Sequence, residues 1–87
     1  MDDNREFRRI ASMTKTEAKR IIGELRQGRL FAGPHSGKDW QVIPLPGGSF
    51  VQIGRDPDRE EQSVISEGEA IAFFVALPFN DARAMLR

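Results

Sequence analysis

The same helix-start pattern occurs twice in this chain, once in each half. Residues 14–17 read Thr-Lys-Thr-Glu and residues 66–69 read Ser-Glu-Gly-Glu, and both have the spacing of a capping box. In this motif a Ser or Thr side chain and the Glu three residues later satisfy backbone N–H groups that a helix leaves unpaired at its start. The residues between the two boxes carry strand and turn signals instead, which indicates an α+β fold.

The first box opens a predicted helix over residues 15–27. Apolar residues follow the box at positions i, i+3, i+4 and i+7, so they share one helical face, and Gly28 offers a left-handed stop. These residues are Ala18, Ile21, Ile22 and Leu25. Three apolar residues within positions 7–11 continue the period almost in phase, so residues 4–27 form either one helix or two. We favour two, with a break near residues 12–14, because Ser and Thr prefer helix starts.

The middle of the chain predicts a β-hairpin. Residues 40–45 and 49–54 are rich in β-branched and aromatic side chains, and glycines in the loop 46–48 permit the positive φ that tight turns require. A two-residue turn there decides which residues share a face. One face would hold Trp40, Val42, Val51 and Ile53, and the other Ile43, Leu45 and Phe50. Residues 62–65 are a candidate third strand.

The second box opens a predicted helix that runs through Leu77, where Pro78 ends it. Apolar residues cover more than half of its circumference, so we expect burial on several sides. A row of small residues at positions 68, 72 and 76 permits close packing, either within the domain or against a partner. Asn80 is the predicted N-cap of a last helix over residues 81–87. The predicted fold class is therefore α+β: a small antiparallel β-hairpin or three-stranded sheet packed against N-terminal and C-terminal helices.

Length and composition exclude several classes of protein. A chain of 87 residues holds one small domain, which we place over residues 1–87. The absence of cysteine excludes a disulfide scaffold, a Cys-type zinc site and a thiol nucleophile. The polar N-terminus does not read as a secretory signal, and the longest apolar stretch, residues 70–79, is about half of a bilayer span. We expect a cytoplasmic protein without membrane contact.

Charge is distributed unevenly, although 13 basic and 13 acidic side chains cancel over the whole chain. Residues 1–38 carry nine Lys and Arg against five Asp and Glu, a net of +4, and residues 39–87 carry four against eight, a net of −4. We expect the two halves to attract each other within one fold. The alternative is that this asymmetry steers a partner.

Residues that carry catalysis or bind metals are scarce. The segment 33–39 differs from a phosphate-binding loop, because one residue is missing between its glycines and Asp follows the Lys; a flexible connection is expected there. His35 and Ser36 have no obvious orienting acid. The acidic run 56–61 lacks the turn glycine of an EF-hand and is expected to be an exposed turn. We predict no enzyme, no cofactor and no metal site.

A surplus of apolar residues leads to the functional hypothesis. A core of this size has limited room for the apolar C-terminal segment as well as both hairpin faces, and an exposed remainder would mark an interface. We predict a non-enzymatic protein-binding role, as an adaptor, an inhibitor or a regulatory protein, with a homodimer as one form. The predicted protein-binding residues are Phe73, Phe74, Leu77, Phe79 and Phe50.

The alternative function is nucleic-acid binding through the basic helix 15–29. Basic residues on one shoulder of its apolar stripe have a spacing that can follow a phosphate backbone. Lys15, Lys19 and Arg26 lie on this shoulder, and Arg8 joins them if one helix runs through from the start. The predicted nucleic-acid-binding residues are these four and Arg29. The same pattern is also common on solvent-exposed helices, where the alkyl chains of Lys and Arg cover the edges of the apolar stripe.

Overall fold

The computed structural model describes residues 13–87. The upstream helical prediction and Arg8 lie outside this range. The described elements are α2 (Lys15–Arg26), β1 (Ala32–His35), β2 (Lys38–Pro44), β3 (Phe50–Arg55), β4 (Glu60–Ile65), α3 (Glu67–Val75) and α4 (Phe79–Met85). The predicted α+β fold, a small antiparallel sheet packed with N-terminal and C-terminal helices, is confirmed. The sheet has four strands rather than two or three.

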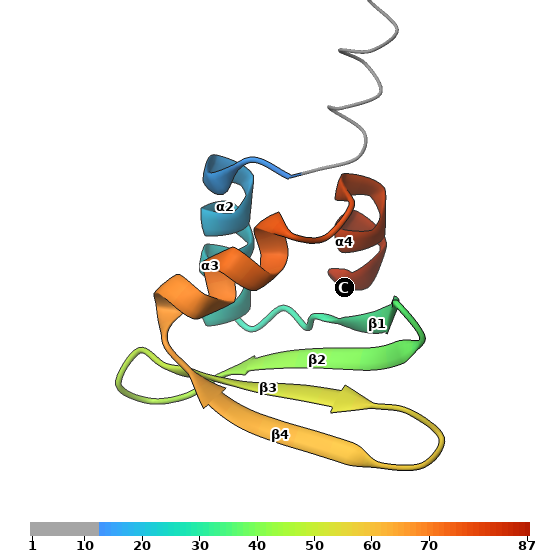
Figure 1. Ribbon diagram of the computed structural model, residues 1–87. Helices are drawn as coiled ribbons and strands as arrows, with labels where there is room; N and C mark the ends of the chain where they lie inside the picture. The colour runs from blue at the N-terminus through green and yellow to red at the C-terminus, as the bar shows by residue number, and fades with distance from the viewer. Residues whose placement is uncertain (1–12) are drawn as a thin grey trace, which may run out of the picture.

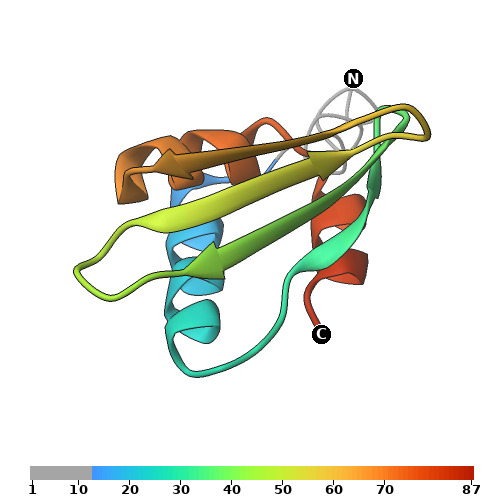
Figure 2. The same ribbon diagram turned by 90° about the horizontal axis from the view of Figure 1, so that it is seen from below.

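The molecule has two layers, a sheet and a layer of helices. The strands run antiparallel in the order β1-β2-β3-β4, and the described helices all lie on one side of the sheet (Figure 1). Figure 2 shows the sheet from the other side, where no described helix crosses it. We call the side that carries the helices the inner face and the opposite side the outer face.

The two predicted capping boxes are both present. The Thr14 hydroxyl accepts a hydrogen bond from the Glu17 backbone N–H at 3.1 Å, and the Glu17 carboxylate accepts one from the Thr14 N–H at 2.9 Å. Ser66 and Glu69 repeat this exchange at 3.1 and 2.8 Å. Each reciprocal pair fixes the first turn of its helix, α2 or α3, and so places that helix start by local chemistry.

The hydrophobic core lies between the inner face and the helices. All four apolar residues predicted on the stripe of α2 are buried in it. Phe31 and Phe74 meet edge to face there, with ring centroids 4.8 Å apart. The fully or nearly fully buried apolar residues are Met13, Ala18, Ile21, Ile22, Leu25, Phe31, Val42, Phe50, Ile65, Ala70, Phe74, Leu77, Ala82 and Met85.

The turn between β2 and β3 has three residues rather than the predicted two. The Leu45 N–H donates to the Ser49 carbonyl at 2.9 Å, which closes the hairpin around residues 46–48. Gly47 and Gly48 both adopt positive φ, of 92° and 99°, a conformation that L side chains rarely adopt. The glycine-rich loop is therefore a turn as expected, but its length differs from the expected one by a single residue.

That one residue corrects the predicted faces of the sheet. A shift of one residue in register moves a strand's side chains to the other face relative to its neighbour. Val42 therefore pairs with Gln52 on the inner face, and Ile43 pairs with Val51 on the outer face. Phe50, predicted to share a face with Ile43, is instead buried beneath the helices.

The segment before β2 is also ordered, which corrects the expected flexible connection. Residues 32–35 form β1 and pair with β2, so that His35 lies opposite Lys38. Ser36 and Gly37 between them have φ of 53° and 80°. Positive φ at both central residues is typical of the two-residue turns whose twist matches a β-hairpin.

The C-terminal helices differ from the prediction at their ends. α3 ends at Val75, two residues early. α4 begins at Phe79 after Pro78, and it too ends two residues early. Pro78 has φ −59°, a value that suits the start of a helix. Proline lacks a backbone N–H, which costs nothing here because an N–H at the start of a helix has no partner within the helix. Asn80 therefore lies inside α4 and does not cap it.

Ion pairs join the basic first half of the chain to the acidic second half. Arg26 Nη2 lies 2.6 Å from Glu67 Oε1, which ties α2 to α3. Lys38 Nζ lies 3.3 Å from Glu61 Oε1, which links β2 to β4 across β3. Both pairs are partly exposed, so each contributes at most about 1 kcal/mol. Their arrangement accords with the expected attraction between the two halves.

The capping boxes give the stability of the fold a defined dependence on pH. The Thr14 N–H lowers the pKa of Glu17, and the Ser66 N–H lowers that of Glu69, because each donates to the ionised carboxylate. The two carboxylates therefore contribute their full stabilisation to the folded state above the unfolded-state pKa of glutamate, about 4.3. This stabilisation is lost as the pH falls through their lower folded-state pKa. We expect the urea midpoint to decrease from about pH 6 to about pH 3.

The matched variant for this prediction is the double substitution Glu17→Gln and Glu69→Gln. It removes both titrating groups while keeping side chains that can still accept from the same N–H groups. The slope of the urea midpoint against pH should become shallower in this acid range. An unchanged slope would show that other carboxylates cause the acid sensitivity.

Candidate protein-binding surface

A row of apolar side chains crosses the outer face of the sheet. Ile43 on β2 pairs with Val51 on β3, and Val51 pairs with Val64 on β4, so the three residues lie side by side on the same face. Val64 is 70% exposed and Ile43 is 42% exposed, while Val51 between them is partly exposed. Ile53 extends the apolar patch by one step along β3. We call these four residues the outer patch.

Polar residues border the outer patch in an ordered way. Gln41 and Gln62 flank Ile53 on the neighbouring strands. The next row towards the β3–β4 turn is Asp39 on β2, Arg55 on β3 and Glu60 on β4, which alternate acidic, basic and acidic. The outer face therefore changes from apolar at one end to charged at the other.

Side chains within the charged row are held by one another. Arg55 donates from Nε to Glu60 Oε1 at 2.8 Å, and the Gln62 amide donates to Glu60 Oε2 at 2.7 Å. The hydrogen bond from Gln62 and the Arg55 guanidinium together lower the pKa of Glu60. The carboxylate stays ionised at neutral pH, so this end of the face presents fixed charges of both signs.

The structure places most of the predicted protein-binding residues in the core. Phe50, Phe74 and Leu77 are buried, so their side chains offer no surface to a partner. Phe73 is half-buried, and its ring centroid lies 5.2 Å from that of Trp40. Phe79 is the first residue of α4. Among residues 13–87, the exposed large apolar side chains are Ile43 and Val64 on the outer face and Leu30 between α2 and β1.

The sequence contained a signal for the outer patch. On β3, Val51 and Ile53 are apolar and are separated by the polar Gln52, so their period of two predicts that they share one face of the sheet. The predicted two-residue turn placed Val51 and Ile53 on the same face as Val42, which is buried. The outer patch was therefore not predicted from the sequence. The row of small residues formed by Gly68 and Ala72 on α3 and Ala76 at its C-cap is exposed.

Two of the basic residues predicted to contact nucleic acid are used within the fold. The Arg26 guanidinium lies 4.8 Å from the Phe50 ring centroid, pairs with Glu67 and donates to the Gly48 carbonyl. Arg29 pairs with Glu24 at 3.4 Å and donates to a backbone carbonyl near the C-terminus. Lys15 and Lys19 are exposed on α2. A phosphate backbone would have to compete for both arginines, which does not favour the nucleic-acid hypothesis.

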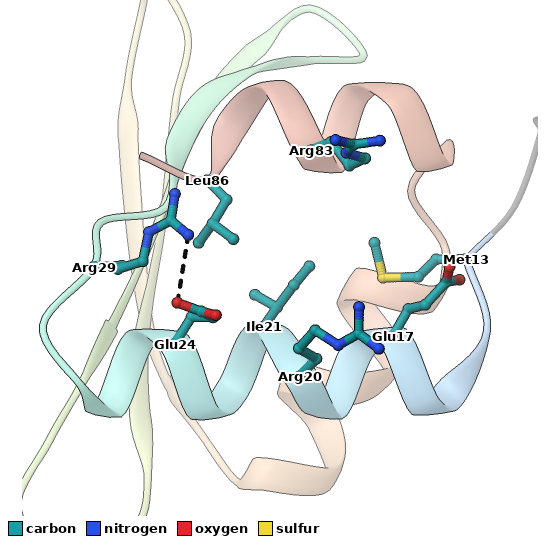
Figure 3. Close-up of a pocket in the computed structure, with 8 residues that line it drawn as sticks. All are labelled: Met13, Glu17, Arg20, Ile21, Glu24, Arg29, Arg83 and Leu86. Carbon is teal, nitrogen blue, oxygen red and sulfur yellow. Dashed lines mark hydrogen bonds and ion pairs between the residues drawn. The ribbon is translucent and has the colours of Figure 1, made fainter.

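A groove of about 380 Å³ lies between α2 and α4 (Figure 3). Its floor includes Met13 and Ile21, which are only 4% and 6% exposed and leave little apolar surface for a ligand. Charged side chains from both helices rise around this floor, and the Glu24–Arg29 pair closes one end. The lining residues are Met13, Glu17, Arg20, Ile21, Glu24, Arg29, Arg83 and Leu86.

The structure supplies His35 with an acidic neighbour that the sequence did not reveal. His35 Nδ1 lies 3.6 Å from Asp81 Oδ2 on α4, a separation longer than a hydrogen bond. The backbone carbonyl of His35 accepts from Trp40 Nε1 at 3.0 Å. Lys38 Nζ lies over the Trp40 ring, 5.6 Å from its centroid.

Residues 56–59 of the acidic run 56–61 form the β3–β4 turn, whereas Glu60 and Glu61 begin β4, which corrects the expectation of a turn over the whole run. The Asp56 carboxylate accepts from the backbone N–H groups of Asp58 and Arg59, both at 2.9 Å. The N–H of Asp58 lowers the pKa of Asp56, which keeps it ionised in this role. Within residues 13–87, no three His, Cys, Asp or Glu side chains gather into a group that could hold a metal ion.

Among residues 13–87, no helix combines the length and the apolar composition that crossing a bilayer requires. No protein-family model, curated protein or solved structure matches the chain.

Proposed function

We propose that this chain is a small non-enzymatic binding protein that docks a protein partner on the outer face of its sheet. The observation that carries the proposal is the exposed cross-strand row of Ile43, Val51 and Val64. No described helix lies over this row (Figure 2). An antiparallel sheet with apolar side chains on both faces is typically covered on both.

The composition of the face suits protein recognition. β-branched side chains on a sheet are stiff, so little conformational entropy is lost when they are buried. Each Å² of apolar surface removed from water contributes about 25 cal/mol. The glutamines and the charged row beside the outer patch form a polar rim, which gives an interface its orientation and specificity.

A capture experiment with a matched control tests the proposal. Tagged wild-type protein, Val64→Arg and Lys19→Glu are used as baits in a lysate of the native host, and the retained proteins are identified by mass spectrometry. Val64 and Lys19 are both exposed, on the sheet and on α2 respectively, so both variants should fold with stability within about 0.5 kcal/mol of wild type.

We expect proteins retained by the wild type and by Lys19→Glu to be lost with Val64→Arg, because a guanidinium in the outer patch cannot be buried without a partner. Retention of the same proteins by all three baits would show that the partner binds elsewhere. Far-UV circular dichroism of each bait confirms that the fold is intact.

A further inference from the structure

We infer that the partner on the outer face is a second copy of this chain, packed sheet against sheet. This inference rests on the proposed function, because it names the occupant of the same surface. Three properties of the outer face carry it: the symmetry of its apolar row, the order of its charges, and its area.

The apolar row is complementary to itself. Consider a two-fold axis that runs parallel to β3 in the plane between two facing sheets. The axis places β3 over β3 of the second copy, and β2 over β4 of the second copy. Val51 then faces the second copy's Val51, Ile53 faces its Ile53, and Ile43 faces its Val64. Gln41 and Gln62 also face each other, so apolar meets apolar and amide meets amide.

The charged row supplies the second argument. With the strands of the two sheets strictly parallel, Arg55 would face the second copy's Arg55, which is unfavourable. Packed sheets instead cross at about 30° because each is twisted. The charged row lies three residues, or about 10 Å, from the centre of the outer patch, so this angle shifts the facing charged rows by about 5 Å, one strand spacing.

A shift of one strand converts repulsion into attraction. Arg55 has an acidic neighbour on either side in its own row, Asp39 on β2 and Glu60 on β4. Whichever way the rows slide, each Arg55 comes to face a carboxylate of the second copy. The acidic-basic-acidic order is therefore complementary to itself at the crossing angle that sheets naturally adopt.

The area of the face sets the strength of the interaction. Four strands about 4.8 Å apart and about 20 Å long give a flat face of roughly 400 Å² per copy, about half of the 800 Å² per partner in a standard stable interface. Interfaces at this lower end belong to weak complexes. The dimer should therefore dissociate on dilution, with a dissociation constant in the micromolar range or above.

Sedimentation equilibrium of the purified full chain tests this arrangement by charge exchange. One variant is Arg55→Glu, and the other combines Asp39→Arg with Glu60→Arg. Each should be monomeric at concentrations where the wild type dimerises, because like charges then face each other. An equimolar mixture should form heterodimers, since the acid at position 55 of one variant meets the arginines of the other. Lys19→Glu is the control and should dimerise as the wild type does.

Chemical cross-linking provides a second measurement that leaves the charges intact. The chain has no cysteine, so Val51→Cys introduces a single thiol that should face its own copy across the axis. A short bismaleimide should join two copies of this variant, whereas Lys19→Cys on α2 should stay uncoupled under the same conditions.

The outcomes separate this inference from the proposed function. A wild-type chain that stays monomeric up to millimolar concentration overturns the homodimer. In that case, loss of captured proteins with Val64→Arg would still support the proposed function, with a different protein docked on the outer face. A dimer that persists in both charge variants overturns the face-to-face arrangement. A dimer that Val64→Arg also leaves intact would in addition remove the outer face as its interface.

Discussion

Replacing Phe74 by alanine is expected to lower the free energy of unfolding by about 3–5 kcal/mol. Phe74 has no exposed surface, its ring packs edge to face on Phe31 at 4.8 Å, and it contacts Phe73 at 5.6 Å. Removing the ring loses its burial and its aromatic contacts, and leaves a cavity between α3 and the inner face. Urea unfolding followed by far-UV circular dichroism measures the change.

The size of this effect matters because the domain is small. A chain of 87 residues is stabilised by roughly 4–13 kcal/mol in total, so Phe74→Ala removes a large fraction and can leave much of the protein unfolded. The control is Val64→Ala on the exposed outer face, which should change stability by less than about 0.5 kcal/mol. Equal effects of the two substitutions would contradict the assignment of core and surface. The two substitutions therefore test whether Phe74, which the sequence predicted to bind a partner, belongs to the core and whether Val64 belongs to the surface.

Replacing Gly54 by valine is expected to cost about 1–3 kcal/mol by overpacking. A Cβ at this position would lie 2.7 Å from Trp40 Cζ3 and 3.0 Å from Cη2, because the indole ring covers the glycine on the inner face. The ring cannot easily retreat. Its Nε1 donates to the His35 carbonyl at 3.0 Å, and Phe73 packs on it at 5.2 Å.

Fluorescence reports this displacement directly, since Trp40 is the single tryptophan of the chain. We expect emission shifted to longer wavelength, together with a lower urea midpoint. The matched control is Gly23→Ala on α2, where no atom lies within 4 Å of the added Cβ. Alanine there should stabilise the protein by about 0.5–1 kcal/mol, because glycine weakens a helix interior. Unchanged emission from Gly54→Val would show that the ring has room to move.

The helix starts could be read from the sequence because their physics is local. Thr14 and Glu17, like Ser66 and Glu69, satisfy each other's backbone groups within four residues, and no distant contact is required. The apolar stripe of α2 followed in the same way from helical periodicity alone. The start of α4 was not predicted, because Asn80 competed with Pro78 and the local signals did not separate them.

The sheet shows where local signals are insufficient. The loop 46–48 can close a hairpin with two or with three residues, and both turns use its glycines. The choice depends on which strand faces can be buried beneath α2 and α3, and that condition involves residues far apart in the sequence. β1 was missed for a related reason: its four residues include Gly33 and Pro34, which read as a loop until β2 pairs with them.

The sequence alone therefore determined the two capping boxes, the apolar stripe of α2, the presence of a hairpin and the α+β class, since each depends on contacts within a few residues. The tertiary structure decided which apolar residues are buried and which form a surface. The helices cover only the inner face, so Phe50 and Phe74 stabilise the core while Val64 and Ile43 remain exposed. Because side chains alternate along a strand, one residue in the β2–β3 turn decided that Phe50 faces the core while Val51 and Ile53 face outward.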